Sequence, residues 1–145
     1  MTQSRTSTEP GSRGSKARGL LLFGLAYLVA GAAAVISGWL LRDQHPLIVV
    51  AVADVVATLV IWGFSIGFNN SSTYDAYWSV APLAIIAYFV AIAPEGVPVA
   101  RQVLVVALVT LWGLRLTWNW ARGWPGLHHE DWRYVDIRGW SGRFY

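Results

Sequence analysis

The chain has no cysteine and carries little charge. Of its 145 residues, 13% are Asp, Glu, Lys or Arg, whereas 55% are hydrophobic, and the mean hydropathy is +0.45. The absence of cysteine excludes a disulfide framework, a thiol nucleophile, thiolate ligation of zinc and an iron–sulfur cluster. A soluble domain of this size buries only about two thirds of its surface, which is too little to hide so many apolar residues. The composition therefore indicates a membrane protein.

Four apolar segments account for this composition, at about residues 20–41, 47–68, 78–93 and 101–120. A helix that rises 1.5 Å per residue needs about twenty residues to cross the hydrocarbon layer. The third segment is the shortest, and we place Pro82 in its first turn, where a missing N–H costs little. We predict an all-α, polytopic membrane protein with a bundle of four transmembrane helices.

The two ends of the chain differ from these segments. Residues 1–19 are polar and basic, so we predict a disordered cytoplasmic tail. A secretory signal peptide is the alternative for the start of the chain, but its apolar region is usually about 7–15 residues long. Residues 121–145 are polar, basic and aromatic, and we predict a cytoplasmic loop there.

The distribution of Lys and Arg predicts the orientation. Eight of them would lie on the side of both termini, namely Arg5, Arg13, Lys16, Arg18, Arg122, Arg133, Arg138 and Arg143. The two turns on the other side hold only Arg42 and Arg101. The positive-inside rule then places both termini, and the loops 69–77 and 121–145, in the cytoplasm. Because the basic residues flank apolar segments, we do not expect a nucleic-acid partner.

Small residues predict where the helices pack. Ala26, Ala30, Ala34 and Gly38 recur every four residues, and Gly63 and Gly67 form a GxxxG pattern. Small side chains let transmembrane helices approach closely. We expect both stripes to be packing seams.

Asp54 is the acid inside the second segment, about 11 Å from its outer end. A charged carboxylate at this depth costs some kcal/mol, so we expect Asp54 to be neutral, paired or facing a wet cavity. Thr58 lies one turn further and shares its face. The sequence leaves open whether Asp54 is structural or part of a proton or substrate site.

Arg115 lies inside the fourth segment, about 9 Å deeper than Asp54, which argues against a pair between them. We expect its side chain to extend toward the cytoplasm, where Asp75 and Asp131 are available. Arg115 is then either an interfacial anchor or a clamp for a ligand phosphate or carboxylate.

Tryptophan and histidine are concentrated near the end of the fourth segment. Its Trp residues suit an aromatic belt at the membrane surface or the wall of a pocket for a flat ligand. They are Trp112, Trp118, Trp120, Trp124 and Trp132. His128, His129, Glu130 and Asp131 are consecutive, and neighbouring loop residues rarely converge on one ion, so we predict no metal site.

Two stretches carry a family resemblance. One is residues 69–82, NNSSTYDAYWSVAP; the other is residues 111–120, LWGLRLTWNW, continuing to residues 130–134, EDWRY. Together they resemble the N-terminal half of an uncharacterised bacterial membrane family in the superfamily of steroid 5-alpha-reductases and isoprenylcysteine methyltransferases. The resemblance covers roughly residues 20–145. It implies NADPH-dependent reduction of a C=C bond in a lipid or steroid-like substrate, at the bacterial inner membrane.

The resemblance also implies roles for single residues. It places Tyr74, Asp75 and Tyr77 in the catalytic site, where a tyrosine hydroxyl could donate a proton or a hydrogen bond. It places five residues near the cofactor at the cytoplasmic helix ends, namely Arg115, Asn119, Asp131, Arg133 and Tyr134.

The sequence departs from the family pattern after residue 145. Relatives continue with more helices and an Arg-His-Pro-Asn-Tyr-type segment that holds most cofactor contacts. We therefore expect an incomplete, inactive half of the family fold, which binds NADPH poorly and lacks a C-terminal half or membrane partner. A small four-helix carrier is an alternative, although such carriers usually have an acid in their first helix, and this chain has none there. A non-catalytic membrane subunit is the other alternative to the reductase-like function.

Overall fold

The computed structural model describes residues 10–129 and 132–141, and within them the chain is all-helical, without a strand. The five helices are α1 (Pro10–Leu40), α2 (Pro46–Phe68), α3 (Thr73–Ala91), α4 (Val99–Gly123) and α5 (Trp132–Ser141). In this part of the chain, α1 to α4 are long and apolar enough to cross a membrane. The prediction of an all-α protein with four membrane-spanning helices is confirmed.

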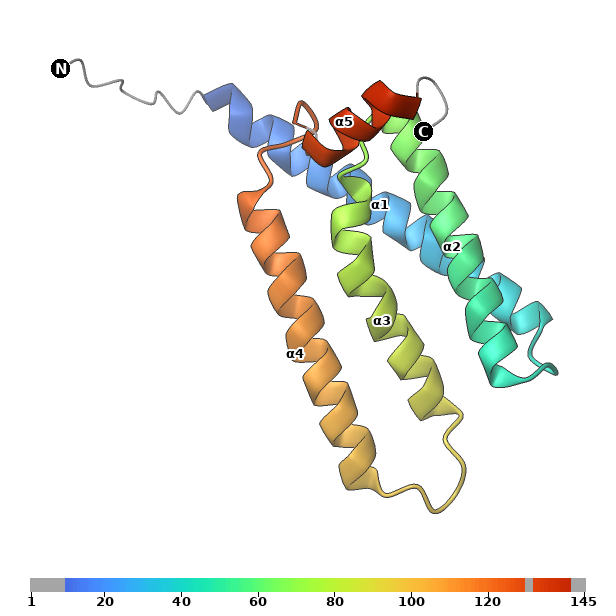
Figure 1. The fold of residues 1–145 in the computed structure, drawn as a ribbon. Helices are drawn as coiled ribbons and strands as arrows, with labels where there is room; N and C mark the ends of the chain where they lie inside the picture. The colour runs from blue at the N-terminus through green and yellow to red at the C-terminus, as the bar shows by residue number, and fades with distance from the viewer. Residues whose placement is uncertain (1–9, 130–131, 142–145) are drawn as a thin grey trace.

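The four long helices form two antiparallel hairpins (Figure 1). α1 packs on α2 and α3 packs on α4, with fewer contacts between α2 and α3. The α1–α2 and α3–α4 turns lie at one end of the molecule, which we call the turn end. The short helix α5 crosses the opposite end, together with the α2–α3 loop, and we call it the α5 end.

Local signals fix both ends of α2. His45 precedes the helix and its Nδ1 accepts a hydrogen bond from the Leu47 amide at 3.3 Å, while Pro46 occupies the first turn. Asn69 ends the helix with a φ of 50°, a left-handed conformation that asparagine tolerates better than most residues. The predicted bounds of this segment are close to the observed ones.

Helix α3 begins at Thr73, earlier than residue 78, which was predicted from hydropathy. The added turn is polar, but its side chains bond to neighbouring elements; Tyr77, for example, donates to Asp54 on α2. Pro82 consequently lies in the middle of the helix, so its predicted place in the first turn is wrong.

Two segments that were predicted to be irregular contain helix. α1 begins at Pro10, so residues 10–19 are helical rather than disordered; residues 1–9 lie outside the described part. Contacts with the end of α4 stabilise this start, because Lys16 Nζ donates to the Arg122 carbonyl at 3.0 Å. Gly19 lies against the Trp124 ring. A Cβ atom on Gly19 would lie only 2.6 Å from this ring. Helix α5 similarly occupies part of the predicted loop 121–145.

The two small-residue stripes behave differently. Ala26 and Ala30 are buried, and a Cβ on Gly38 would lie 3.5 Å from Val49, so the α1 stripe is a packing seam as predicted. Gly63 and Gly67 are exposed, and a Cβ on either would meet nothing within 4 Å. The predicted GxxxG seam is therefore wrong in the described structure.

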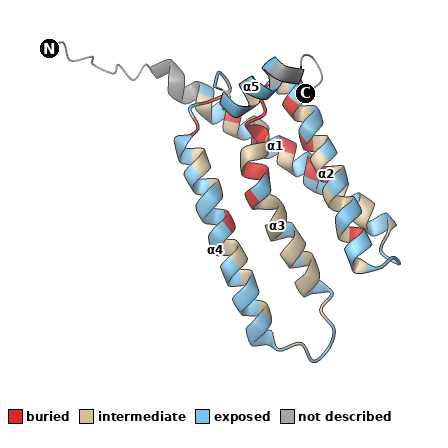
Figure 2. Ribbon diagram, in the orientation of Figure 1, coloured by how far each residue is buried: buried red, intermediate tan, exposed pale blue. Residues whose placement is uncertain are grey.

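A close contact between helices is found at Gly113 on α4 instead. A Cβ there would lie 2.7 Å from the Ser79 carbonyl oxygen, and the Ser79 and Thr117 hydroxyls are 2.7 Å apart. Figure 2 shows that buried residues gather toward the α5 end, whereas most of α4 is exposed. The bundle is thus tightest near α5 and open elsewhere to lipid or to further protein.

Candidate functional site

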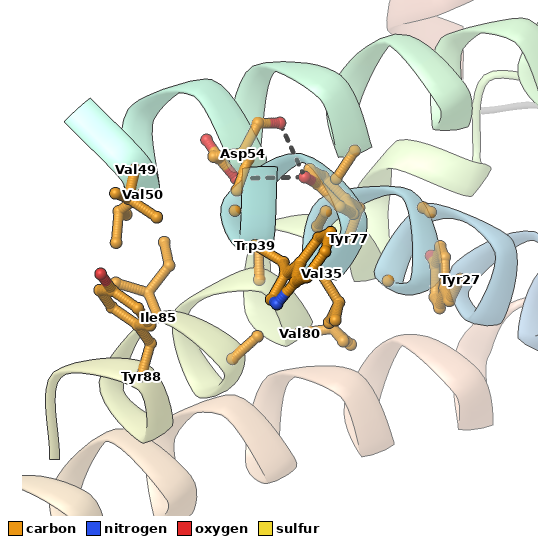
Figure 3. A pocket seen from close by; sticks show the side chains of 18 of the residues that line it. Tyr27, Val35, Trp39, Val49, Val50, Asp54, Tyr77, Val80, Ile85 and Tyr88 are labelled. Carbon is orange, nitrogen blue, oxygen red and sulfur yellow. Dashed lines mark hydrogen bonds between the residues drawn. The ribbon is translucent and has the colours of Figure 1, made fainter. Parts of the chain in front are cut away.

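A cavity of about 380 Å³ lies between α1, α2 and α3. Its α1 wall includes the small-residue stripe from Ala30 to Gly38, and valines and alanines of α2 and α3 form most of the wall on those helices (Figure 3). A volume of this size and an apolar lining with a few polar groups are typical of sites for small hydrophobic ligands.

The main polar group in the wall is a carboxyl–phenol pair. The Tyr77 hydroxyl donates to Asp54 Oδ1 at 3.1 Å and accepts a hydrogen bond from Thr58 Oγ1 at 3.2 Å. Tyr77 is only 5% exposed, while Asp54 is partly exposed at the cavity wall. The expectation that Asp54 is paired or faces a cavity is confirmed, as is the face that it shares with Thr58.

Two further tyrosines hold this pair in place. The Tyr27 hydroxyl donates to the Thr73 carbonyl at 2.6 Å, which ties α1 to the start of α3. The Tyr74 hydroxyl donates to the Thr58 carbonyl at 3.4 Å, and its ring meets Tyr77 edge to face. Tyr27 also lines the cavity, whereas Tyr74 does not belong to its wall. Of the predicted catalytic residues, Tyr77 is therefore the one that faces the cavity.

The α2–α3 loop is fastened to the segment after α4 by Asn70. Its Nδ2 donates to the carbonyls of Leu127 and His129, at 2.9 and 3.0 Å, and its Oδ1 accepts from the Ser72 amide. Asn70 is buried, so a side chain with both donors and an acceptor suits this position. The predicted meeting of loops 69–77 and 121–145 at one end is confirmed for the described residues.

Asp75 connects α3 to α5. The Tyr134 hydroxyl donates to Asp75 Oδ1 at 3.0 Å, and an Arg133 nitrogen lies 3.8 Å from the same oxygen. The structure thus brings together one predicted catalytic residue and two predicted cofactor residues. Asp75 lies at the α5 end and does not line the cavity.

Arg115 and Asn119 lie elsewhere. Gly113 and Thr117 face α3, and a helix turns about 200° over two residues, so Arg115 and Asn119 point away from that contact. Both are exposed, and Arg115 forms no ion pair with a residue that the structure describes. The expected approach of Arg115 to Asp75 is wrong, because Arg133 and Tyr134 occupy that carboxylate.

The four described residues among those predicted for NADPH do not converge on one site. Arg133 and Tyr134 engage Asp75, Arg115 and Asn119 face away from α3, and Asp131 lies outside the described residues. Residues 10–129 and 132–141 contain no cluster of three potential metal ligands. Glu130 also lies outside these ranges, so the prediction of no metal at residues 128–131 stays a prediction.

Sequence reasoning singled out Asp54 but left its role open, and it did not connect Asp54 with Tyr77. The sequence gives no signal for this pair, because Tyr77 was predicted in the cytoplasmic loop 69–77 and Asp54 near the outer end of its span. Arg42 lies at the turn end of the cavity, but sequence reasoning considered it only for the membrane orientation. Its position directly after the small-residue stripe is the sequence feature that indicates a place in the cavity wall.

Comparison with known proteins gives a family but no activity. A family model described as "Protein of unknown function (DUF1295)" matches residues 61–144. "Uncharacterized protein C594.04c" of Schizosaccharomyces pombe is 31% identical over 98 residues, which are 66% of this chain and 28% of that protein. The chain therefore matches less than a third of this relative's length, and no solved structure matches it significantly. The match over more than half of its residues shows that the chain belongs to the DUF1295 family.

Proposed function

We propose that the chain supplies the hydrophobic substrate site of a membrane reductase that acts on a C=C bond of a lipid or steroid-like molecule. The observation that carries the proposal is the Asp54–Tyr77 pair in the wall of an apolar cavity. The resemblance to steroid 5-alpha-reductases supports the reaction class. We propose the reductase activity itself for a longer assembly that includes these helices.

The pair suits a ligand whose C=C bond is conjugated to a carbonyl group. A ligand oxygen near Tyr77 would accept a hydrogen bond from the phenol. Such a bond withdraws electron density from the C=C bond and stabilises the enolate that forms on reduction. The apolar walls lower the local dielectric constant, which strengthens the interaction. The role of this chain is then to bind the substrate and polarise its carbonyl.

The reaction also needs a hydride donor, which the resemblance suggests is NADPH. Because the described residues among those predicted for it lie apart, we propose that this chain alone binds NADPH poorly and is inactive.

We further propose that the α5 end faces the cytoplasm of a bacterial cell and that the turn end faces outward. Lys16, Arg18 and Arg122 lie toward the α5 end, and Arg42 and Arg101 lie at the turn end. This distribution follows the positive-inside rule.

Binding of an enone labelled with ¹³C at its carbonyl tests the substrate site. We expect the carbonyl resonance of a long-chain or steroid enone to move downfield when it binds the purified chain. Tyr77→Phe removes the phenol and should abolish most of this shift. Affinity should fall about tenfold, because a hydrogen bond contributes roughly 1.4 kcal/mol.

Tyr88→Phe is the matched control, because Tyr88 lines the same cavity but is farther along α3 and is not a partner of Asp54. It should leave the resonance unchanged. A shift that survives Tyr77→Phe, or binding with no shift at all, would show that the pair does not polarise the carbonyl.

A further inference from the structure

The cavity extends well beyond the Asp54–Tyr77 pair, toward the turn end. Its lining on α1 runs from Tyr27 to Arg42, which is about 22 Å along the helix, and on α3 from Tyr77 to Tyr88, about 16 Å. An apolar lining that extends this far along the helices suits an extended hydrocarbon chain.

A cation lies at the turn end of this cavity. Arg42 follows α1 and is the basic residue among the described residues that line the space. Its guanidinium carbon lies 4.8 Å from the centre of the Trp39 ring, which also lines the cavity. The cavity therefore has an acid–phenol pair part of the way along and a permanent positive charge at its turn end.

The guanidinium is not strongly engaged by the protein. Its contact with Asp43 joins Nε to Oδ1 at 4.0 Å, and both side chains are largely exposed, at 58% and 88%. An exposed pair at this distance contributes little. The two terminal nitrogens are not part of this contact, and such a planar fork suits a carboxylate or a phosphate. The N-terminus of α2 lies at the same end and adds partial positive charge.

We propose that the cavity binds a single-chain amphiphile, with an anionic head group at Arg42 and its hydrocarbon chain along the α1 stripe toward Tyr77. The head group is a carboxylate or a phosphate, since both match the guanidinium. This inference names the substrate class for the proposed function, and it rests on that function only in taking this cavity as the substrate site.

Three probes with the same chain test the head group: hexadecanoate, hexadecyl phosphate and uncharged hexadecanol. Their apparent Kd values for the full chain can be measured by native mass spectrometry from micelles of a neutral detergent. We expect at least one anion to bind about tenfold more tightly than the alcohol, which corresponds to ~1.4 kcal/mol. A preference for one anion identifies the head group as carboxylate or phosphate.

Arg42→Gln should bring the anions to within about twofold of the alcohol and leave the alcohol unchanged, which also shows that the cavity still forms. Arg42→Lys should keep most of the preference, because the charge remains. Arg101→Gln is the control, since Arg101 is exposed at the turn end but does not line the cavity. This variant should bind all three probes as the unaltered chain does.

Equal binding of the alcohol and both anions, or a preference that survives Arg42→Gln, would overturn the inference. The result is separate from the carbonyl test. Loss of the Arg42 preference with an intact Tyr77-dependent carbonyl shift would refute the head group alone. The reverse pattern would refute carbonyl activation and leave an anionic amphiphile as the ligand.

Discussion

Replacing Gly113 with alanine should weaken the contact between α3 and α4. The new Cβ would lie 2.7 Å from the Ser79 carbonyl oxygen and 3.2 Å from Leu83 Cδ2. The first neighbour is backbone, which cannot turn aside as the end of a side chain can. The helices must therefore separate or shift at this point.

The expected loss of stability is about 2 kcal/mol. Overpacking by a methyl group costs ~1–3 kcal/mol. Separation of the helices also lengthens the 2.7 Å contact between the Ser79 and Thr117 hydroxyls, and such bonds in membrane proteins contribute ~0.6 kcal/mol on average. The smaller helix entropy loss of alanine offsets up to ~1 kcal/mol of this cost.

Gly63→Ala provides a control of opposite sign. Gly63 is also within a membrane-spanning helix, but a Cβ there would meet nothing within 4 Å. We expect this variant to be unchanged or more stable by up to ~1 kcal/mol. Unfolding of both variants in mixed micelles with increasing sodium dodecyl sulfate, followed by far-UV circular dichroism, gives the free-energy difference. If Gly113→Ala is as stable as Gly63→Ala, the close approach of α3 and α4 is not a feature of the folded protein.

Two further predictions concern the α5 end and the orientation. Asn70→Asp replaces the amide nitrogen that donates to two carbonyls with a carboxylate oxygen. We therefore expect the free energy of unfolding to fall by about 2 kcal/mol and hydrogen exchange in the segment after α4 to become faster. Unchanged exchange there would contradict the role of this side chain. The chain has no cysteine, so single-cysteine variants report topology directly. A membrane-impermeant maleimide should label Gln44→Cys in intact cells and His128→Cys only after permeabilisation, and the opposite pattern would reverse the proposed orientation.

The membrane-spanning helices were predictable because hydropathy and length act locally. The stripe of Ala26, Ala30 and Gly38 was also predictable, since a period of four residues defines a helix face. Asp54 and Thr58 share a face for the same reason. These features depend on one helix at a time.

Features that depend on how two helices are placed were not predictable. Gly63 and Gly113 are both glycines in apolar helices, and the sequence does not say which one meets a neighbour. The bond between Asp54 and Tyr77 likewise requires the axial register of α2 and α3. The placement of Arg115 away from α3 follows from the face of α4 that contains Gly113, which hydropathy does not reveal because α4 is apolar on several sides.

The contact between Gly19 and Trp124 has a consequence for biosynthesis. Together with the bond from Lys16 to the Arg122 carbonyl, which spans 106 residues of sequence, it joins the first and fourth membrane-spanning helices. The ribosome releases α1 long before α4, so this junction forms only after α4 has entered the bilayer. Each hairpin closes over a short turn and can assemble earlier. A nascent chain halted before Gly123 would thus contain paired helices, but α1 would still lack its contact with the end of α4.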